Sequence, residues 1–275
     1  MPEGHVTHRL AIAYRDVFGG RETRSSSPQG RFAVEAAKID GKTLTGAQAY
    51  GKHLFVEFDD LSVHVHLGLA GKLHFGSGPD RAITGMIRWR LEDEENVADL
   101  RGPAACELFT PDQVDAVEAR LGPDPLRADA DPERGWAKVS RSRTPIALLL
   151  MDQQVTAGVG NIFRAEVLYR HRIDPMMPGQ LLKRAEWQRI WDDLVVLMHY
   201  GVEHGRIDTV RPEHEPEAMG RPPRVDPHGG EVYVYRRAGQ SCLVCGSQVR
   251  METVGSRNLF WCPKCQRPTR RRPKQ

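Results

Sequence analysis

The sequence predicts an α+β protein: an N-terminal helix, then a β-sandwich or flattened barrel, then a mainly helical region that ends in a small zinc-binding module. Three observations support this fold class. Apolar residues near the N-terminus recur at three- and four-residue spacing, several segments between 23 and 110 resemble strands, and four cysteines form two Cys-x-x-Cys pairs near the C-terminus. The 275 residues suffice for two modest domains or one large one.

A helix is expected to begin almost at the N-terminus. Its apolar stripe consists of Val6, Leu10, Ala13, Tyr14 and Val17. Pro2 and Glu3 stand immediately before this stripe. The fixed φ of proline and the negative charge of glutamate both suit the first turn of a helix, so the simplest interpretation gives the two residues a structural role.

Residues 23–110 are expected to form strands and turns. The β-rich segments between Gly, Asp and Pro residues are RFAVEAAKI (31–39), KHLFVEF (52–58), SVHVHLGLAGKLHFG (62–76) and GMIRWRLED (85–93). A polar segment rich in Pro and Asp follows at 122–135 and is typical of a domain boundary. We therefore expect an N-terminal domain over 1–122 and a linker over 123–144.

The region 145–230 is expected to be helical at first and extended later. Helices are predicted over 145–155 and 162–171, joined by the tight AGVGN turn, and over 185–205. The inner face of the third helix contains Trp187, Ile190, Trp191, Leu194 and Met198. Pro, Gly, Glu and Arg dominate 206–230, which predicts a loop.

A zinc-ribbon module is expected over 231–267, followed by a basic tail over 268–275. Cys242 and Cys245 are separated by sixteen residues from Cys262 and Cys265, a spacing typical of four-cysteine zinc sites. Four thiolates fill a tetrahedral site, so one structural ion is expected. A disulfide framework is the alternative, and the expected cytoplasmic setting disfavours it. The fifth cysteine, Cys106, is interpreted as a small buried hydrophobic residue.

Charge and hydropathy bear on the cellular compartment and the binding partners that we expect. The formal net charge is only +3, but acidic residues collect in EDEEN (92–96) and EHEPE (213–217), and the last residues, 267–275, are basic. A basic terminus is either simply solvated or suited to a polyanion. No apolar run is long enough for a membrane span, and no signal peptide is recognisable. We expect a cytoplasmic, nucleoid-associated monomer with no membrane partner.

Four separated motifs occur in a characteristic order: PEG (2–4), GKHLF (51–55), DQQVTAGVGN (152–161) and GSRNLFWCPKC (255–265). Together they resemble the formamidopyrimidine-DNA glycosylase and endonuclease VIII family of base-excision repair enzymes, over nearly the whole chain. The resemblance implies a β-sandwich domain followed by a helix–two-turns–helix domain with a zinc finger.

The resemblance also implies a covalent mechanism at the N-terminus. Removal of Met1 would leave Pro2 with a free secondary amine, which attacks the sugar C1′, displaces the damaged base and forms a Schiff base. An α-amine has a reference pKa of roughly 8, so part of it is neutral at physiological pH. Glu3 would exchange protons with sugar and base, and Lys52 would bind phosphate and protonate leaving groups. Lys52 as an ordinary turn lysine is the structural alternative.

Damaged DNA is the partner that the resemblance implies, in duplex, bubble or single-stranded form. Asn161 and Arg257 would bind phosphates near the lesion, and zinc would hold the short hairpin that carries Arg257. Asn161 as a simple helix cap is compatible with this role. His66 would add a backbone contact, although with His64 it also suits a satisfied sheet histidine; an HVH metal site is a further alternative.

The family fills the space left by an extruded base with apolar side chains. Leu69, in the HLGLAG segment, matches such a wedge, but Ala70 beside it is small. The Arg-Phe pair of formamidopyrimidine glycosylases is absent, and DLRGPAACE (99–107) lies there instead. These departures favour the endonuclease VIII branch and oxidised pyrimidines, with strand cleavage by β,δ-elimination.

Two other classes of protein remain to be considered. A catalytically degenerate or zinc-ribbon DNA-binding protein would need the basic surface and the zinc, but not Pro2, Glu3 and Lys52 together. A metal-dependent nuclease would need clustered carboxylates, and EDEEN is better interpreted as a solvated hairpin.

Overall fold

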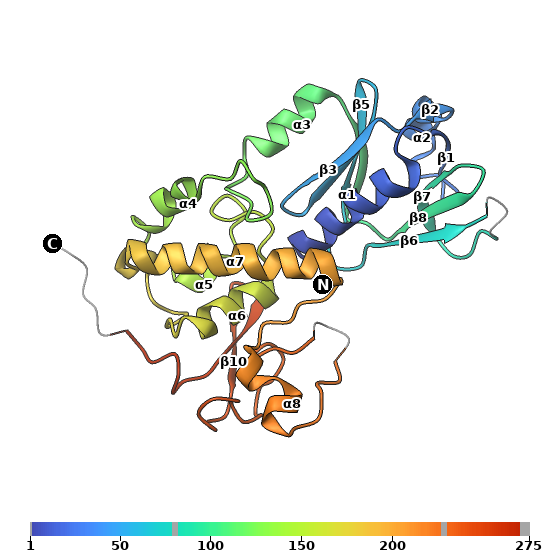
Figure 1. The fold of residues 1–275 in the computed structure, drawn as a ribbon. Helices are drawn as coiled ribbons and strands as arrows, with labels where there is room; N and C mark the ends of the chain where they lie inside the picture. The colour runs from blue at the N-terminus through green and yellow to red at the C-terminus, as the bar shows by residue number, and fades with distance from the viewer. Residues whose placement is uncertain (1, 79–81, 227–229, 270–275) are drawn as a thin grey trace. The chain divides into compact units, whose positions relative to one another are not determined.

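The computed structural model describes residues 2–78, 82–226 and 230–269, and the chain divides into two compact units, Met1–Arg120 and Leu121–Gln275 (Figure 1). The first unit contains α1 (Gly4–Phe18), β1 (Glu22–Ser26), α2 (Ala33–Ile39), β2 (Lys42–Thr43), β3 (Gly46–Tyr50), β4 (His53–Phe58), β5 (Leu61–His66), β6 (Lys72–Ser77), β7 (Ile87–Glu92), β8 (Asn96–Arg101), β9 (Ala105–Phe109) and α3 (Pro111–Glu118). The second contains α4 (Pro132–Val139), α5 (Ile146–Leu149), α6 (Asn161–Arg170), η1 (Gly179–Leu181), α7 (Arg184–His204), η2 (Pro212–His214), α8 (Pro216–Met219), β10 (Arg250–Val254) and β11 (Arg257–Trp261).

Two antiparallel sheets form the body of the first unit and confirm the predicted β-sandwich. One sheet has the order β2-β1-β7-β8-β6 and the other the order β3-β4-β5-β9. A single apolar core draws on both sheets, with Leu54, Val56, Val63 and Val65 from the second and Trp89, Leu91, Ala98 and Leu100 from the first. The EDEEN segment is the end and turn of the β7–β8 hairpin, as predicted.

Helix α1 buries Ala11, Tyr14 and Phe18 in this core. The predicted stripe is confirmed only in part, because Tyr14 is its one buried residue and the others are partly buried. The ring of Tyr14 stacks on Trp89 at a centroid distance of 5.8 Å and meets Phe75 edge-on at 5.2 Å. Figure 1 shows the helix running alongside β3. Because a buried aromatic pair contributes about 0.5–1.5 kcal/mol beyond its burial, these contacts fix the helix on the sandwich. The N-terminal residues are fixed with it.

One strand prediction was wrong. RFAVEAAKI (31–39) forms helix α2, not a strand. Its buried residues Phe32, Ala36 and Ile39 lie three and four positions apart, while Val34 is 70% exposed. Three alanines and a lysine favour a helix, and this preference together with the helical spacing outweighs the β-formers Phe, Val and Ile.

The second unit has its own core, built around α6 and α7. The predicted inner face of α7 is confirmed, because Trp187, Ile190, Trp191, Leu194 and Met198 are all buried there. Helix α6 matches the prediction within a residue at each end, whereas 145–155 contains only the four-residue α5. The finger belongs to the same core through Val249, Val254, Leu259 and Phe260.

The segment expected to be a linker, 123–144, is packed against this core. It contains α4, whose first residue Pro132 accepts a 3.1 Å hydrogen bond from the indole N–H of Trp187. A Cβ at Gly135 would lie 2.8 Å from the same indole. Close packing against α7 therefore makes this segment part of the second unit, and the division of the chain falls at 120/121.

A buried carboxylate organises the 206–230 region. Glu166, fully buried in α6, accepts a 2.6 Å hydrogen bond from the hydroxyl of Thr209. It also accepts three backbone N–H groups, those of Tyr233, Val234 and Tyr235, at 2.7–2.8 Å. This group satisfies one carboxylate with four donors, as a buried charge requires.

The predicted loop over 206–230 contains only the short elements η2 and α8, and residues 227–229 lie outside the described residues. The same holds for 270–275 of the predicted basic tail. None of the helices in the described ranges is long and apolar enough to traverse a lipid bilayer.

Candidate functional site

The predicted nucleophile and its neighbour stand at the start of α1. Glu3 is the residue before the helix, and its carbonyl accepts the first helical hydrogen bond from the N–H of Val6 at 2.9 Å. The side chain of Glu3 is buried and Pro2 is half-buried. Met1, whose removal the nucleophile requires, lies outside the described residues. Pro2 is therefore held one residue from a rigid element rather than on a loose tail.

Lys52 lies in a two-residue turn that is attached to the same helix. Gly51 and Lys52 connect β3 to β4, and Gly51 has a φ of 58°, which only glycine adopts without strain. The hydroxyl oxygen of Thr7 lies 2.7 Å from the carbonyl oxygen of Gly51 and 2.8 Å from that of Gly4, so its one proton is shared between the two acceptors. Because Thr7 lies in the first turns of α1, this bond brings the Lys52 turn to the helix start that carries Pro2 and Glu3.

The histidines of β4 and β5 form a chain on one sheet face. His53 Nδ1 lies 2.9 Å from His64 Nε2, and His64 Nδ1 lies 3.4 Å from a carboxylate oxygen of Glu107. Burial, reinforced by the neighbouring histidines, lowers the pKa of His53 to about 3, and burial likewise lowers the pKa of His66. Both are neutral at physiological pH.

The ring of His66 packs against that of His53, with a distance of 5.2 Å between the ring centroids. Three or more His, Cys, Asp or Glu side chains that lie close enough together can bind one metal ion. Among the described residues, the four cysteines of the finger are the group that meets this condition. The HVH metal alternative has no support from this geometry.

Leu69 projects from the turn between β5 and β6, where 62% of it is exposed. This turn packs against the one that follows β8: a Cβ at Gly68 would lie 2.7 Å from that of Ala104, and one at Gly102 would meet Ala70. Small residues allow the two turns to approach closely. Leu69 is the large apolar side chain that this pair of turns, 67–71 and 102–104, exposes.

Asn161 and Arg257 lie close together in the second unit. Asn161 is the first residue of α6, and its side-chain amide donates to the carbonyl of Asn258 at 3.0 Å. Its oxygen accepts from Arg164, which also donates to Asn258 at 3.2 Å. An amide group has two N–H donors, and the bond to Asn258 uses one of them.

The hairpin of β10 and β11 presents Arg257. Gly255 and Ser256, with φ of 58° and 60°, form its two-residue turn, and Arg257 pairs with Val254 beside it. Within residues 2–78, 82–226 and 230–269, the guanidinium of Arg257 has no ion-pair partner. A free cation at a hairpin tip is well placed to contact a phosphate.

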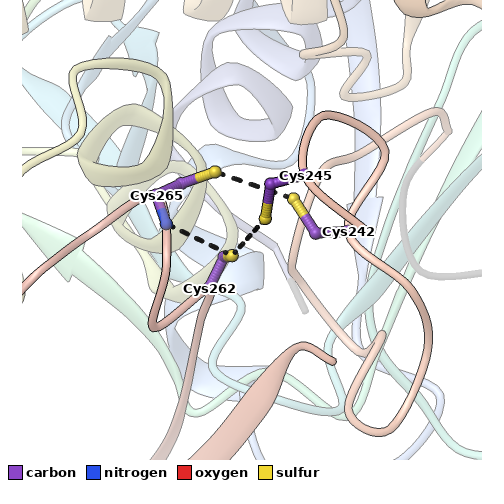
Figure 2. A group of neighbouring side chains, drawn as sticks. All are labelled: Cys242, Cys245, Cys262 and Cys265. Carbon is purple, nitrogen blue, oxygen red and sulfur yellow. Dashed lines mark hydrogen bonds between the residues drawn. The ribbon is translucent and has the colours of Figure 1, made fainter. Parts of the chain in front are cut away.

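The four cysteines of the finger converge on one point, as predicted (Figure 2). All four Sγ atoms lie within 4.8 Å of one another, with Cys242 3.9 Å from Cys265 and Cys245 3.4 Å from Cys262. A tetrahedral zinc ion with Zn–S bonds of about 2.3 Å needs sulfur atoms about 3.8 Å apart. The cysteines therefore fit one structural zinc ion and leave no ligand position for catalysis.

Cys106 is buried in β9, and burial raises the pKa of its thiol to about 12. The structure confirms it as an unreactive apolar residue. Two contacts escaped sequence reasoning: the Thr7 bond to Gly51, and a 3.0 Å bond between the hydroxyl of Tyr169 and Cys242. The two donors, Thr7 and Tyr169, belong to no motif, so no sequence signal could have found these contacts.

Comparison with known families matches three models in succession. Residues 1–106 match the formamidopyrimidine-DNA glycosylase N-terminal domain, residues 121–211 the formamidopyrimidine-DNA glycosylase H2TH domain, and residues 239–268 the zinc finger found in FPG and IleRS. The matched ranges coincide with the sandwich, the helical region and the cysteine module described above.

Similar proteins cover between 79% and 97% of the chain. Endonuclease 8 1 of Mycobacterium tuberculosis is 47% identical over 271 residues, covering 97% of this chain and 100% of its own. Formamidopyrimidine-DNA glycosylase of Streptococcus pneumoniae is 33% identical over 224 residues, 79% of each chain. The structure of Lactococcus lactis Fpg in complex with abasic-site DNA superposes on this chain with a TM-score of 0.80 at 22% identity, and the match covers 97% of this chain and 100% of that one. This comparison shows a similar fold.

Proposed function

Because the chain belongs to the formamidopyrimidine-DNA glycosylase and endonuclease VIII family, we propose that it is a bifunctional DNA glycosylase and abasic-site lyase that removes oxidised bases. The observation that carries this proposal is the Thr7–Gly51 hydrogen bond, which links the Lys52 turn to the helix that begins after Glu3. This bond supports the proposed roles of Pro2 as nucleophile, Glu3 as acid and Lys52 as phosphate-binding cation, because covalent catalysis requires such groups to be held at fixed positions.

The chemistry follows from the terminal amine. With Met1 removed, the lone pair of Pro2 nitrogen attacks the sugar C1′, the glycosidic bond breaks, and the base leaves with a proton that Glu3 supplies. The Pro2 nitrogen then gives its proton to the Glu3 carboxylate, Glu3 passes a proton to the ring oxygen O4′ as the C1′–O4′ bond breaks, and an iminium ion forms. This cation withdraws electrons and acidifies the C2′ proton, whose removal expels the 3′ phosphate by β-elimination. A second elimination releases the 5′ phosphate, with Lys52 supporting the leaving groups.

Borohydride trapping tests this proposal against its alternative, a catalytically degenerate DNA-binding homologue. Borohydride reduces the iminium to a stable amine, so an active enzyme becomes covalently joined to abasic or lesion-containing DNA through Pro2. Mass spectrometry of the joined peptide locates the bond. DNA binding with no trapped adduct at any lesion would favour the degenerate homologue and contradict the proposal.

We propose that Asn161 and Arg257 hold DNA phosphates and that the monomer binds damaged DNA through them. Replacing Arg257 with alanine is expected to weaken binding to all sequences alike and to make the dependence of log K on log salt about 0.9 shallower, since one phosphate contact is lost. Fluorescence anisotropy at several salt concentrations measures the slope. Arg250→Ala, on the other strand of the hairpin, is the matched control; an unchanged slope for Arg257→Ala would exclude the contact.

The Thr7 bond gives a prediction of its own. Thr7→Val removes the hydroxyl that bonds the carbonyl of Gly51, and the loss of one intramolecular hydrogen bond costs about 0.5–1.5 kcal/mol. We expect a stability loss of that size and single-turnover base release slowed about tenfold, because the Lys52 turn is no longer held at α1. Thr7→Ser keeps the hydroxyl and should restore both. Equal rates for the valine and serine variants would show that the bond does not position Lys52.

We further propose that oxidised pyrimidines are the preferred lesions. Leu69 projects beside Ala70, Gly102 and Ala104, so the two turns can fill only part of the space left by an extruded base. Extrusion should then favour bases that stack poorly, because they cost least to remove from the helix. Saturated, non-planar pyrimidines have this property, whereas 8-oxoguanine stacks and pairs well.

Single-turnover rates on matched oligonucleotides check this preference. Thymine glycol and dihydrouracil are expected to be released faster than 8-oxoguanine opposite cytosine, and bubble or single-stranded DNA should be tolerated. Leu69→Ala should reduce the rate on duplex more than on single strands, where no gap has to be filled. Faster release of 8-oxoguanine would contradict the argument from the two turns.

A further inference from the structure

Helix α6 contacts the zinc finger at both of its ends. At the N-terminal end, Asn161 and Arg164 donate to the backbone carbonyl of Asn258 in β11. At the C-terminal end, the hydroxyl oxygen of Tyr169 lies 3.0 Å from Sγ of Cys242 and 4.0 Å from Sγ of Cys265. Ten helical residues span about 15 Å, so one rigid rod joins the hairpin to the metal-binding sulfurs.

When zinc is bound, the donor in the hydrogen bond between Tyr169 and Cys242 is defined. A cysteine that binds zinc does so as a thiolate, which has no proton to give and can only accept. The tyrosine hydroxyl keeps its proton at neutral pH and is therefore the donor. Hydrogen bonds from the surrounding protein to metal ligands orient them and tune the metal, and their loss typically costs 10–100-fold in affinity.

Packing holds the hydroxyl in place. Tyr169 is only 4% exposed, and its ring stacks on that of Tyr233 at 4.6 Å with an interplanar angle of 27°. The backbone N–H of Tyr233 is in turn bonded to the buried carboxylate of Glu166, on α6 itself. The phenol therefore has little freedom to leave the sulfur atoms, and the bond to Cys242 costs little side-chain entropy.

We propose that Tyr169 is a positioning residue for the zinc site, whose hydroxyl donates to the thiolate of Cys242 and makes metal retention by the finger depend on α6. The zinc ligands themselves lie on two short turns of 242–245 and 262–265, outside any helix. The hydrogen bond from Tyr169 anchors one of these turns to helix α6. This role concerns the metal and is separate from the chemistry at Pro2.

Tyr169→Phe tests the proposal, because it removes one oxygen atom and keeps the ring that stacks on Tyr233. We expect zinc affinity, measured by competition with a chromophoric chelator, to fall about tenfold. Tyr200→Phe is the matched control: it removes a hydroxyl that donates to Asp208 at 2.9 Å in the same unit, away from the cysteines. The control should bind zinc like the unaltered protein.

Cobalt substitution separates a lost hydrogen bond from a general loosening. The sulfur-to-cobalt charge-transfer bands of Tyr169→Phe should shift in energy relative to those of the unaltered protein and of Tyr200→Phe, while the d–d bands remain those of a tetrahedral site. DNA affinity at saturating zinc should be unchanged. Zinc affinity and charge-transfer bands equal to the control would overturn the proposal.

A measurement on the unaltered protein keeps the test valid if Tyr169→Phe does not fold. With cadmium in place of zinc, the hydroxyl proton of Tyr169 should exchange slowly with solvent and show scalar coupling to the metal nucleus through the sulfur. A hydroxyl proton that exchanges freely and shows no such coupling would also overturn the proposal. Neither result bears on whether Pro2 forms a Schiff base.

Discussion

Base excision is expected to stop when Met1 remains attached to Pro2, while binding to lesion-containing DNA persists. In a Met1–Pro2 peptide bond the proline nitrogen is an amide, and its lone pair is delocalised into the carbonyl. It can neither attack C1′ nor form an iminium ion. Single-turnover base release and borohydride trapping should both be lost, whereas anisotropy should give an affinity close to that of the processed protein.

Pro2→Gly should also lower base release by about 100-fold or more, for a different reason. A secondary amine yields an iminium with a permanent positive charge, whereas a glycine amine yields an imine that must first be protonated. The pyrrolidine ring, which fixes the direction of the nitrogen lone pair relative to Cα, is lost as well. A protein with an N-terminal extension, compared before and after its cleavage to expose Pro2, provides the control. Normal excision with the extension in place would refute the assignment of Pro2.

Removal of zinc is expected to have the second large effect. Chelation, or Cys262→Ser, should lower DNA affinity by about two orders of magnitude or more, because the hairpin that presents Arg257 loses its anchor. Structural zinc contributes roughly 10–16 kcal/mol in isolated finger peptides, far more than so short a hairpin could supply. Val254, Leu259 and Phe260 are shared between the finger and the second core, so that unit should loosen too.

The β-sandwich should survive this treatment, since its core contains residues of the first unit alone. Far-UV circular dichroism should retain the strand signal while anisotropy reports lost binding. Cys106→Ala is the matched control, because it alters a cysteine outside the cluster and should leave zinc content and DNA affinity unchanged. Full DNA affinity in metal-free protein would contradict a structural role for zinc in binding.

Local patterns predicted much of this fold because the deciding interactions are short in range. The helical spacing in α1 and α7 and the runs of β-formers in β4 and β5 are local patterns, and each Cys-x-x-Cys pair lies within one short turn. The strand prediction for RFAVEAAKI failed because it gave weight to Phe, Val and Ile and overlooked the three alanines and the helical spacing of Phe32, Ala36 and Ile39. The 123–144 segment was misjudged because its contact partner, Trp187, lies some fifty residues away.

The residues of the candidate site were also predictable only in part. Pro2, Lys52 and the cysteines belong to motifs, so the sequence alone nominates them. The contacts that hold them in position come from residues outside those motifs, Thr7 for the Lys52 turn and Tyr169 for Cys242. Such contacts follow from how distant segments pack, and a hydroxyl carries no sign of its partner in the sequence.

The hydrogen bonds of Glu166 affect how readily the chain segment between its partners can change in length. It bonds Thr209 before the long excursion through 210–232 and the N–H groups of Tyr233, Val234 and Tyr235 after it. Closing a flexible loop costs only about 0.6 kcal/mol more for each doubling of its length. With both ends held by one side chain, insertions and deletions between them are thermodynamically cheap. A change in the length of this segment is therefore expected to cost less stability than the loss of Glu166, which holds both of its ends.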